Sequence, residues 1–266
     1  MSMSHADRRA DNRFTAGTFA PDPRPAPRAR MLAAQTKLEL TLLLRNGEQL
    51  LLTMFIPITL LIGLTLLPFG DLGDPRVNRV MPAVMMVAVM STAFTGQAIA
   101  VGFDRRYGAL KRLGATPLPR WGIIAGKSAA VAIVVAIQMV VLGAIGFALG
   151  WRPEVVGLLF GVVVIALGTV MFAALGLLLG GTLKAEIVLA LANVLWFVMA
   201  GIGAVVFGGD GIPDALHTLA RLVPSGAFAE ALDQGLTGSV DVFAIVVMVA
   251  WGAAGAWLAV RLFKFT

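Results

Sequence analysis

Long apolar runs without charged residues dominate the hydrophobic pattern of this 266-residue chain. Six runs are long enough to cross a bilayer, because about 20 residues at ~1.5 Å rise span ~30 Å of hydrocarbon. These runs are 49–70, 80–103, 128–151, 155–183, 187–209 and 242–260. The pattern predicts an all-α polytopic membrane protein with six transmembrane helices. With flanking residues included, the predicted spans lie near 49–70, 80–103, 120–150, 154–181, 186–208 and 241–262, within a transmembrane domain at 48–266.

The residues before the first run are predicted to form two different segments. Residues 1–30 contain six Arg and four closely spaced Pro with almost no large apolar side chain, which is typical of a disordered tail. Residues 31–47 favour a helix at the membrane interface. Its apolar stripe is poor, because Leu40 and Leu44 lie opposite Met31, Ala34, Leu38 and Leu42.

A short basic segment, DRRYGALKRLGATPLPR at 104–120, separates the second and third runs. Phe103, Tyr107, Leu110 and Gly114 fall near helical spacing on one side, and the basic residues lie away from them. We therefore predict an amphipathic helix of about three turns, ended by Thr116-Pro117. Asp104 stands where an N-cap carboxylate accepts the first free backbone amides.

The connection between the fifth and sixth runs is longer and more acidic. Pro213 and Pro224-Ser225 each begin a predicted short helix, and the second ends near Gly235. Both have a partly apolar face, so we predict two re-entrant helices that dip into the outer leaflet. They form either a packed lid or an exit gate, with Pro224, Ser225 and Phe228 as gate candidates.

Composition and charge support a membrane protein and assign its sides. The chain is 58% hydrophobic and 14% charged, against roughly 25% charged in soluble domains. With loops assigned alternately to two sides, 17 of the 21 Lys and Arg residues fall on one side. The positive-inside rule makes that side cytoplasmic, together with both termini and the tail. The basic charge therefore points to membrane topology and not to nucleic acid.

The candidate chemistry narrows the function classes. The chain has no Cys, no phosphate-binding loop of the GxxxxGK[ST] type, and two His that both lie outside the runs. We predict no catalytic residue, no metal site and no cofactor in this chain. The six runs also contain no Asp, Glu, Lys, Arg or His, whereas ion-coupled transporters keep a titratable group at membrane depth. Three function classes remain: a transport pore powered by a separate protein, a non-transporting scaffold or assembly factor, and a passive facilitator.

A transport path would be lined by apolar and mildly polar side chains within the runs. The candidates in the second and fifth runs are Met86, Met90, Phe94, Gln97, Asn193, Trp196 and Phe197. The adaptable thioether of Met suits varied hydrophobic cargo, although such residues more often simply pack. The fourth run carries Gly157-x-x-x-Gly161 and Gly176-x-x-x-Gly180, which let another helix approach closely, more often within one chain than between chains.

The order of these features resembles the membrane subunit of type-2 ABC exporters, the group of bacterial drug, lipid and polysaccharide exporters. That family has an interface helix, six spans, a coupling helix between spans two and three, and two short outer helices around a Pro. The coupling motif is matched by Asp104, Arg105, Gly108, Leu110, Leu113, Thr116 and Pro117, and PSGAFAEAL at 224–232 resembles the outer helices. Lys111-Arg112 departs from the pattern, since the family commonly has an acidic residue there.

The resemblance implies how such a chain works. Two separate ATPase subunits, which carry the ATP and Mg, receive the coupling helix and the interface helix. A second membrane subunit, identical or related, completes the path in the cytoplasmic membrane. The residues expected to couple to the ATPase are Asp104, Arg105, Arg106, Gly108, Leu110, Lys111, Leu113, Thr116 and Pro117. The expected cargo is a drug-like or lipid-like amphipathic molecule, moved outward.

Overall fold

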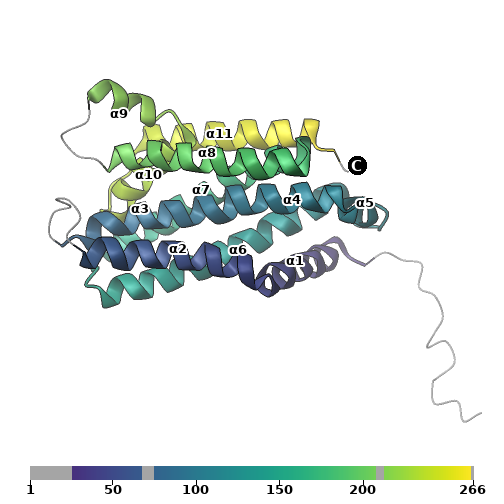
Figure 1. Cartoon of the computed structure of the whole chain (residues 1–266), viewed down its shortest axis with the longest axis horizontal. Helices are drawn as coiled ribbons and strands as arrows, with labels where there is room; N and C mark the ends of the chain where they lie inside the picture. Colours follow the sequence, from purple (N-terminus) through teal and green to yellow (C-terminus); the bar gives the residue numbers. More distant parts are fainter. Residues whose placement is uncertain (1–25, 68–74, 208–212, 265–266) are drawn as a thin grey trace, which may run out of the picture.

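The computed structural model describes residues 26–67, 75–207 and 213–264, with only the backbone described at 48–50 and 52. Within these ranges the chain forms helices joined by short connections, and no strand occurs among them (Figure 1). In chain order the helices are α1 Arg28–Arg45, α2 Gly47–Leu66, α3 Val77–Val89, the π-helical η1 Met90–Gly96, α4 Gln97–Arg106, α5 Ala109–Gly114, α6 Arg120–Ala148, α7 Val155–Thr182, α8 Ala185–Val206, α9 Asp214–Ala220, α10 Pro224–Leu236 and α11 Val242–Leu262. The tail predicted at 1–30 lies almost wholly outside the described residues.

Five of these helices have the length and composition to cross a membrane. They are the continuous helix Val77–Arg106, made of α3, η1 and α4, together with α6, α7, α8 and α11. The first of the six predicted spans corresponds to α2, whose apolar part, Thr53–Leu66, is shorter than the other five. The described chain is thus a helical membrane protein with five clear spans.

Helix α7 lies at the centre of the bundle and packs against α4, η1, α10 and α11. Its glycines explain how close these neighbours come. A Cβ on Gly176 would lie 2.7 Å from the Phe94 carbonyl oxygen, and one on Gly180 would lie 2.4 Å from that of Ala98. Gly157 and Gly161 meet Leu236 of α10 in the same way. The prediction that these glycines serve packing within one chain is confirmed.

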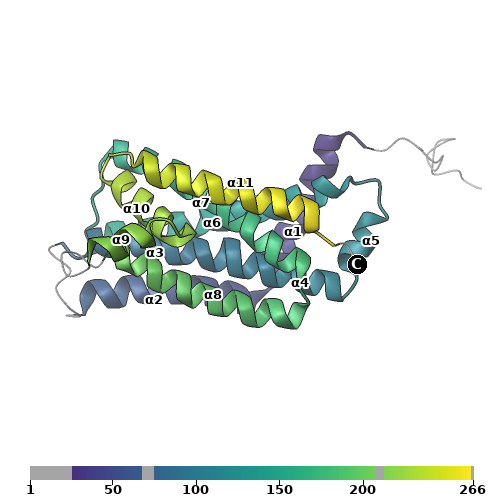
Figure 2. The same cartoon turned by 90° about the horizontal axis from the view of Figure 1, so that it is seen from above.

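The bundle has two structurally different ends. At one end lie α1, α5 and the last described residues of α11, and α1 packs at an angle along α6 (Figures 1 and 2). At the other end lie α9 and the turn between α6 and α7. Helix α10 begins inside the bundle, where Phe228 packs on Phe172 of α7, and runs outward to this second end, where Leu236 meets Gly157. It packs against α3, α7, α8 and α11. We refer to them as the α1 end and the α9 end.

Candidate functional site

The segment between α4 and α6 differs from the single helix predicted for 104–117. Helix α4 continues through Arg106, the chain turns at Gly108 with a φ of 70°, and α5 spans only Ala109–Gly114. Gly108 is suited to this corner because a side chain disfavours the left-handed region. The predicted N-cap role of Asp104 is wrong, since Asp104 lies in the last turns of α4 and Gly108 holds the N-cap position of α5.

Helix α5 is fixed to the bundle by its two leucines, the buried Leu110 and the half-buried Leu113. Leu110 is fully buried, in a cluster with Val101 of α4, Ile123 of α6 and Leu177 of α7. The turn that follows is closed by Thr116, whose hydroxyl donates to the Leu113 carbonyl oxygen at 2.6 Å. A helix of six residues is too short to be stable by itself, so α5 depends on this cluster for its position.

Three charged side chains join α1, α4 and α6 at the α1 end. The Lys127 Nζ lies 2.8 Å from Glu39 Oε2 and 2.5 Å from Asp104 Oδ2. The side chains of Lys127 and Glu39 are 8% and 10% exposed, and that of Asp104 is 35% exposed. We call these three residues the ion triad. A buried ammonium flanked by two carboxylates holds three helices in one geometry, because moving any of them leaves a charge without its partner.

The sequence around the ion triad explains why α1 docks there. Gln35 donates to Glu39 Oε1 at 2.7 Å from one turn away, so the buried face of α1 is polar. Gly126 lets α1 come close to α6, since a Cβ there would lie 2.5 Å from Gln35 Cγ. Leu38 and Leu42 on α1 remain exposed. The poor apolar stripe noted in the sequence is therefore the consequence of a polar docking face.

Arg105 links α4 to the end of α7. Its Nη1 donates to the carbonyl oxygens of Gly180 and Leu183, each at 3.0 Å. These carbonyls lie at the C-terminus of α7, where a cation is stabilised by the helix dipole and by unpaired acceptors. Arg105 therefore ties α4 to α7, and Asp104 ties α4 to α1 and α6 through the ion triad.

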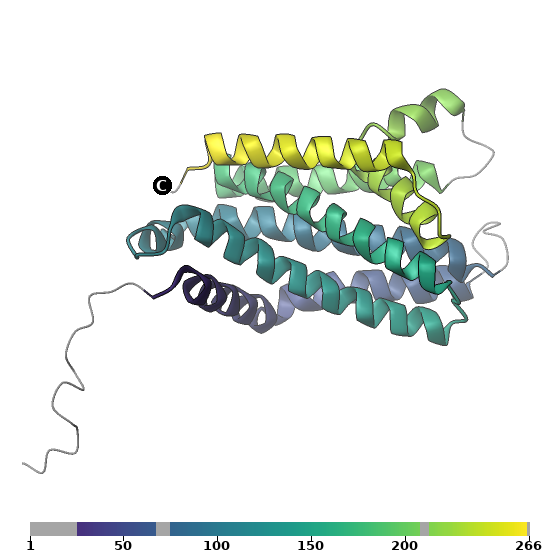
Figure 3. The same ribbon diagram turned by 180° about the vertical axis from the view of Figure 1, so that it is seen from behind.

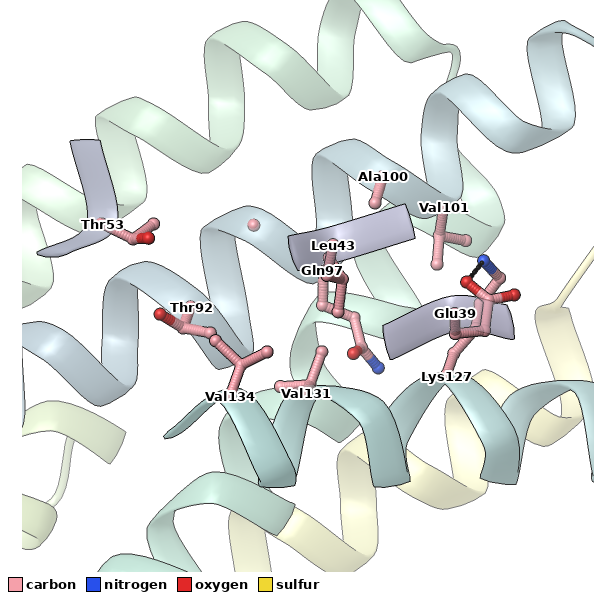
Figure 4. A pocket seen from close by; sticks show the side chains of 11 residues that line it. Glu39, Leu43, Thr53, Thr92, Gln97, Ala100, Val101, Lys127, Val131 and Val134 are labelled. Atoms are coloured by element: carbon pink, nitrogen blue, oxygen red, sulfur yellow. Dashed lines mark hydrogen bonds and ion pairs between the residues drawn. The ribbon is translucent and has the colours of Figure 1, made fainter. Parts of the chain in front are cut away.

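A small cavity lined by both polar and apolar side chains extends from the ion triad into the bundle (Figure 4). Its volume is about 40 Å³, and Gln97 lies in its wall between Lys127 and Thr92. Deeper still, the Thr92 hydroxyl donates to Gln138 Oε1 at 2.9 Å. Gln138 Nε2 donates in turn to the Thr53 carbonyl oxygen at 3.1 Å, which connects α6 to α2. Polar contacts thus continue from the α1 end to the π-helical segment, a type of helix distortion frequent at functional sites.

The predicted coupling residues divide into an inward set and an outward set. Asp104, Arg105 and Leu110 hold the segment in place. Arg106, Lys111, Thr116 and Pro117 are exposed at the α1 end, whereas Gly108 and Leu113 are half-buried. Arg106 forms an ion pair of 2.5 Å with Glu186 at the start of α8. The exposed set, together with Tyr107 and Arg112, presents a basic surface beyond the ends of the spans.

The seven predicted path residues are not gathered on one surface. Met86, Met90, Phe94 and Gln97 are buried in the bundle. On α8, Asn193 and Phe197 are exposed and face away from that core, while Trp196 is half-buried and donates to the Ser91 hydroxyl at 3.0 Å. In this conformation the first four residues act as core, and only the α8 residues are accessible.

The three gate candidates are also buried. Pro224 begins α10, and Ser225 and Phe228 have no exposed surface. The Phe228 ring lies 5.8 Å from that of Phe172 on α7, edge to face, and occupies the space left open by Gly168. In this conformation the N-terminal part of α10 fits the packed lid better than an open gate.

Two residues of the ion triad, Glu39 and Lys127, were missed as site residues by the sequence reasoning. The third charge-free run begins at residue 128, so the sequence places Lys127 just outside it among the cytoplasmic cations. In the structure α6 begins at Arg120 and Lys127 lies buried two turns inside it. The signal that could have found the pair is a lone Lys within a span, which requires a carboxylate partner at the same depth.

Comparison with known families decides the class of the protein. The model of the ABC-2 type transporter family matches residues 32–237, from α1 through α10. The chain belongs to the ABC-2 type transporter family. It is therefore a transmembrane permease subunit of an ABC transporter and not a catalytic subunit. A search of curated protein sequences finds no match to it.

Proposed function

We propose that this ABC-2 permease subunit exports a hydrophobic or amphipathic molecule, drug-like or lipid-like, across the cytoplasmic membrane. Power comes from two ATPase subunits that bind ATP and Mg. In this proposal α2 is the first of six spans, the α1 end and both termini are cytoplasmic, and α9 lies outside. The strong excess of Lys and Arg at the α1 end supports that orientation.

The ion triad is the observation that carries the proposal. It locks α1, α4 and α6 together, so a force applied to α1 or α5 is transmitted to the spans and not absorbed by local bending. The basic surface of Arg106, Lys111 and Arg112 fits an acidic cleft on the ATPase. Closure of two ATPase subunits on ATP would move the α1 end as one body and shift α2, α3 and α8.

A second membrane subunit is needed to enclose a path. The surface of α8 that carries Asn193 and Phe197 is the best candidate for this contact, since Phe197 is 70% exposed and Val194 57%. Helix α2 lies along the same edge of the bundle, and its Phe55 is 60% exposed (Figure 2). Cargo would pass between the two subunits along this edge, and the Met side chains of α3 would be uncovered when the spans shift.

Purification from the native membrane first tests whether an ATPase partner powers transport. A permease should bring down a soluble ATPase with a phosphate-binding loop. A scaffold should not, and a facilitator should transport in vesicles without nucleotide. Co-purification with no ATPase, or nucleotide-independent transport, would overturn the proposal.

Substitutions at the corner of α5 test the coupling. Gly108→Val forces a β-branched residue into the left-handed region and should uncouple ATP hydrolysis from transport. Gly108→Asn is the matched control, because Asn tolerates that conformation and nothing lies within 4 Å of the added Cβ. Transport should fall at least about tenfold in the Val variant, a change of ~1.4 kcal/mol, and stay near normal in the Asn variant. Equal transport by both would show that the corner does not couple.

A further inference from the structure

A groove of about 680 Å³ runs between α6 and α7, on the face shown in Figure 3. Met139, Gly143 and Phe147 of α6 form one wall, and Leu158 and Ile165 of α7 form the other. Trp151 lies at the end nearest the turn between the two helices. Its volume falls within the ~300–1,000 Å³ range of small-molecule sites, so this α6/α7 groove is large enough for a ligand.

The walls of the groove are suited to an apolar occupant. Thr169 carries the one hydroxyl among the described lining residues, and that hydroxyl donates to the Ile165 carbonyl oxygen of its own helix at 2.7 Å. The other lining side chains offer hydrocarbon, thioether or aromatic surface, and Trp151 adds an indole N–H at the end nearest the turn. An occupant with polar groups away from this end would lose its hydration without gaining a partner.

The groove lies at membrane depth and opens toward lipid. Both walls belong to helices that can span a bilayer. Val140, Val162 and Val170, which also line it, are 72%, 64% and 64% exposed. From Ala132 to Phe147 the groove follows α6 for about 22 Å at ~1.5 Å per residue. That length exceeds one leaflet of a ~30 Å hydrocarbon core, so it accommodates an extended acyl chain.

A fixed cation, Arg152, follows Trp151 in the chain, and its guanidinium lies 5.9 Å from the centre of the Phe147 ring, which lines the groove. Arg152 Nη1 donates to the carbonyl oxygens of Phe147 at 2.5 Å and Trp151 at 2.8 Å, which holds the guanidinium at the C-terminus of α6. The residue is exposed, and among the described residues its Nη2 makes no further hydrogen bond. A guanidinium at this depth suits a phosphate group. Glu154, two residues on, is also exposed, so the expected preference for a phosphate rests on Arg152 alone.

We propose that the α6/α7 groove binds one glycerophospholipid from the leaflet at the α9 end. An acyl chain lies along Met139, Gly143 and Phe147, and the phosphate contacts Arg152. This lipid is a resident ligand and not cargo, because the groove lies on the face of the bundle away from α2 and α8 (Figure 2). The proposal rests on the spans and not on the direction or power source of transport.

Gly143 and Ala254 allow a matched test. A Cβ at Gly143 meets nothing within 4 Å although the residue is buried, so the side chain of Gly143→Leu begins in open space and occupies part of the groove. Ala254 on α11 is exposed and does not line the groove, so Ala254→Leu adds apolar bulk outside both the groove and the proposed subunit contact. Arg152→Gln removes the charge and keeps donors for the α6 carbonyls.

Native mass spectrometry of the delipidated full chain, titrated with dioleoyl phosphatidylglycerol and with dioleoylglycerol, reads out the first bound lipid. We expect Gly143→Leu to weaken binding of both lipids about tenfold, and Ala254→Leu to leave it unchanged. Arg152→Gln should weaken phosphatidylglycerol several-fold and leave dioleoylglycerol unchanged. Equal binding by wild type and Gly143→Leu would overturn the proposal. So would a Gly143→Leu variant that changes only the proportion of dimer, because a protein helix would then occupy the groove.

Discussion

The two ends of this permease hold their short helices by different means. At the α1 end, α1 is held by the ion triad of Glu39, Asp104 and Lys127, and three of its leucines, Leu38, Leu42 and Leu44, are exposed. At the other end, α10 is held by the Phe228 ring, which packs on Phe172 over a glycine of α7. A largely buried ion pair between Arg221 and Asp241 occurs here too, but it joins the end of α9 to the start of α11.

The α1 end is therefore a junction whose ion pairs allow one geometry, whereas α10 is a helix held by apolar packing. Charges in a low-dielectric site are costly when separated, so the α1 end is specific in register but sensitive to any change of charge. Apolar packing is tolerant of the charge state and depends on volume. The junction that must transmit a force is the charged one in our proposal. Stability should therefore depend on charge at the α1 end and on side-chain volume at the α9 end.

Removal of Lys127 should have the largest effect. Lys127→Met leaves Glu39 and Asp104 as neighbouring carboxylates with no cation, and we expect a loss of about 3–5 kcal/mol in unfolding free energy. Denaturant titration of the purified protein in detergent measures it. Neutralising all three residues, as in Glu39→Gln, Asp104→Asn and Lys127→Met together, should recover more than half of the loss. A triple variant as unstable as the single one would show that packing, and not charge, holds α1.

Truncation of Phe228 at the α9 end should lower the free energy of unfolding nearly as much as the loss of Lys127 does. Phe228→Ala removes a fully buried ring and leaves a cavity against Phe172 and Gly168, at a cost of about 3–5 kcal/mol. Phe228→Leu keeps most of the volume and should lose clearly less. Neither variant should respond to the charge changes at the ion triad, since the two sites are independent. Strong coupling between them would contradict the division of the molecule into two ends.

The charge-free apolar runs predicted most of the spans, because such runs have few alternatives in a membrane. Through Pro213 and Pro224 the sequence also indicated where α9 and α10 begin. It could not find the ion triad, since Glu39, Asp104 and Lys127 come from three helices and only packing brings them together. It misjudged the basic segment as well. The helical spacing of Phe103, Tyr107 and Leu110 was read as one helix, whereas Gly108 adopts a positive φ and divides it.

An added methyl group at Gly126, where α1 contacts α6, should lower the free energy of unfolding moderately. The same change at a control glycine should raise it. A Cβ on Gly126 would lie 2.5 Å from Gln35 Cγ and 3.4 Å from the Thr36 backbone nitrogen. Gly126→Ala should therefore destabilise by about 1–3 kcal/mol through overpacking. Gly201→Ala, in open space on α8, should stabilise by roughly 0.5–1 kcal/mol through helix propensity. The same titration measures both, and two changes of equal sign would argue against close docking of α1.

The smallest effect concerns Asp233 of α10, which lies outside the five clear spans. Burial, reinforced by Glu230, raises the pKa of this carboxyl, and Arg79 offsets the rise only in part. A raised folded-state pKa favours the protonated form, so this stabilisation is present below the unfolded pKa and is lost as pH rises through the folded pKa. Asp233→Asn, which stays neutral, should be slightly more stable than wild type at pH 7. This advantage should shrink as the pH falls toward about 4, the ordinary range of an Asp carboxyl.

Melting temperatures of the two proteins across that range measure it, and a constant difference would show that Asp233 does not titrate with folding. Since Asp233 belongs to the packed α9 end, such a small effect beside the large one at Lys127 would confirm that charge governs stability mainly at the α1 end.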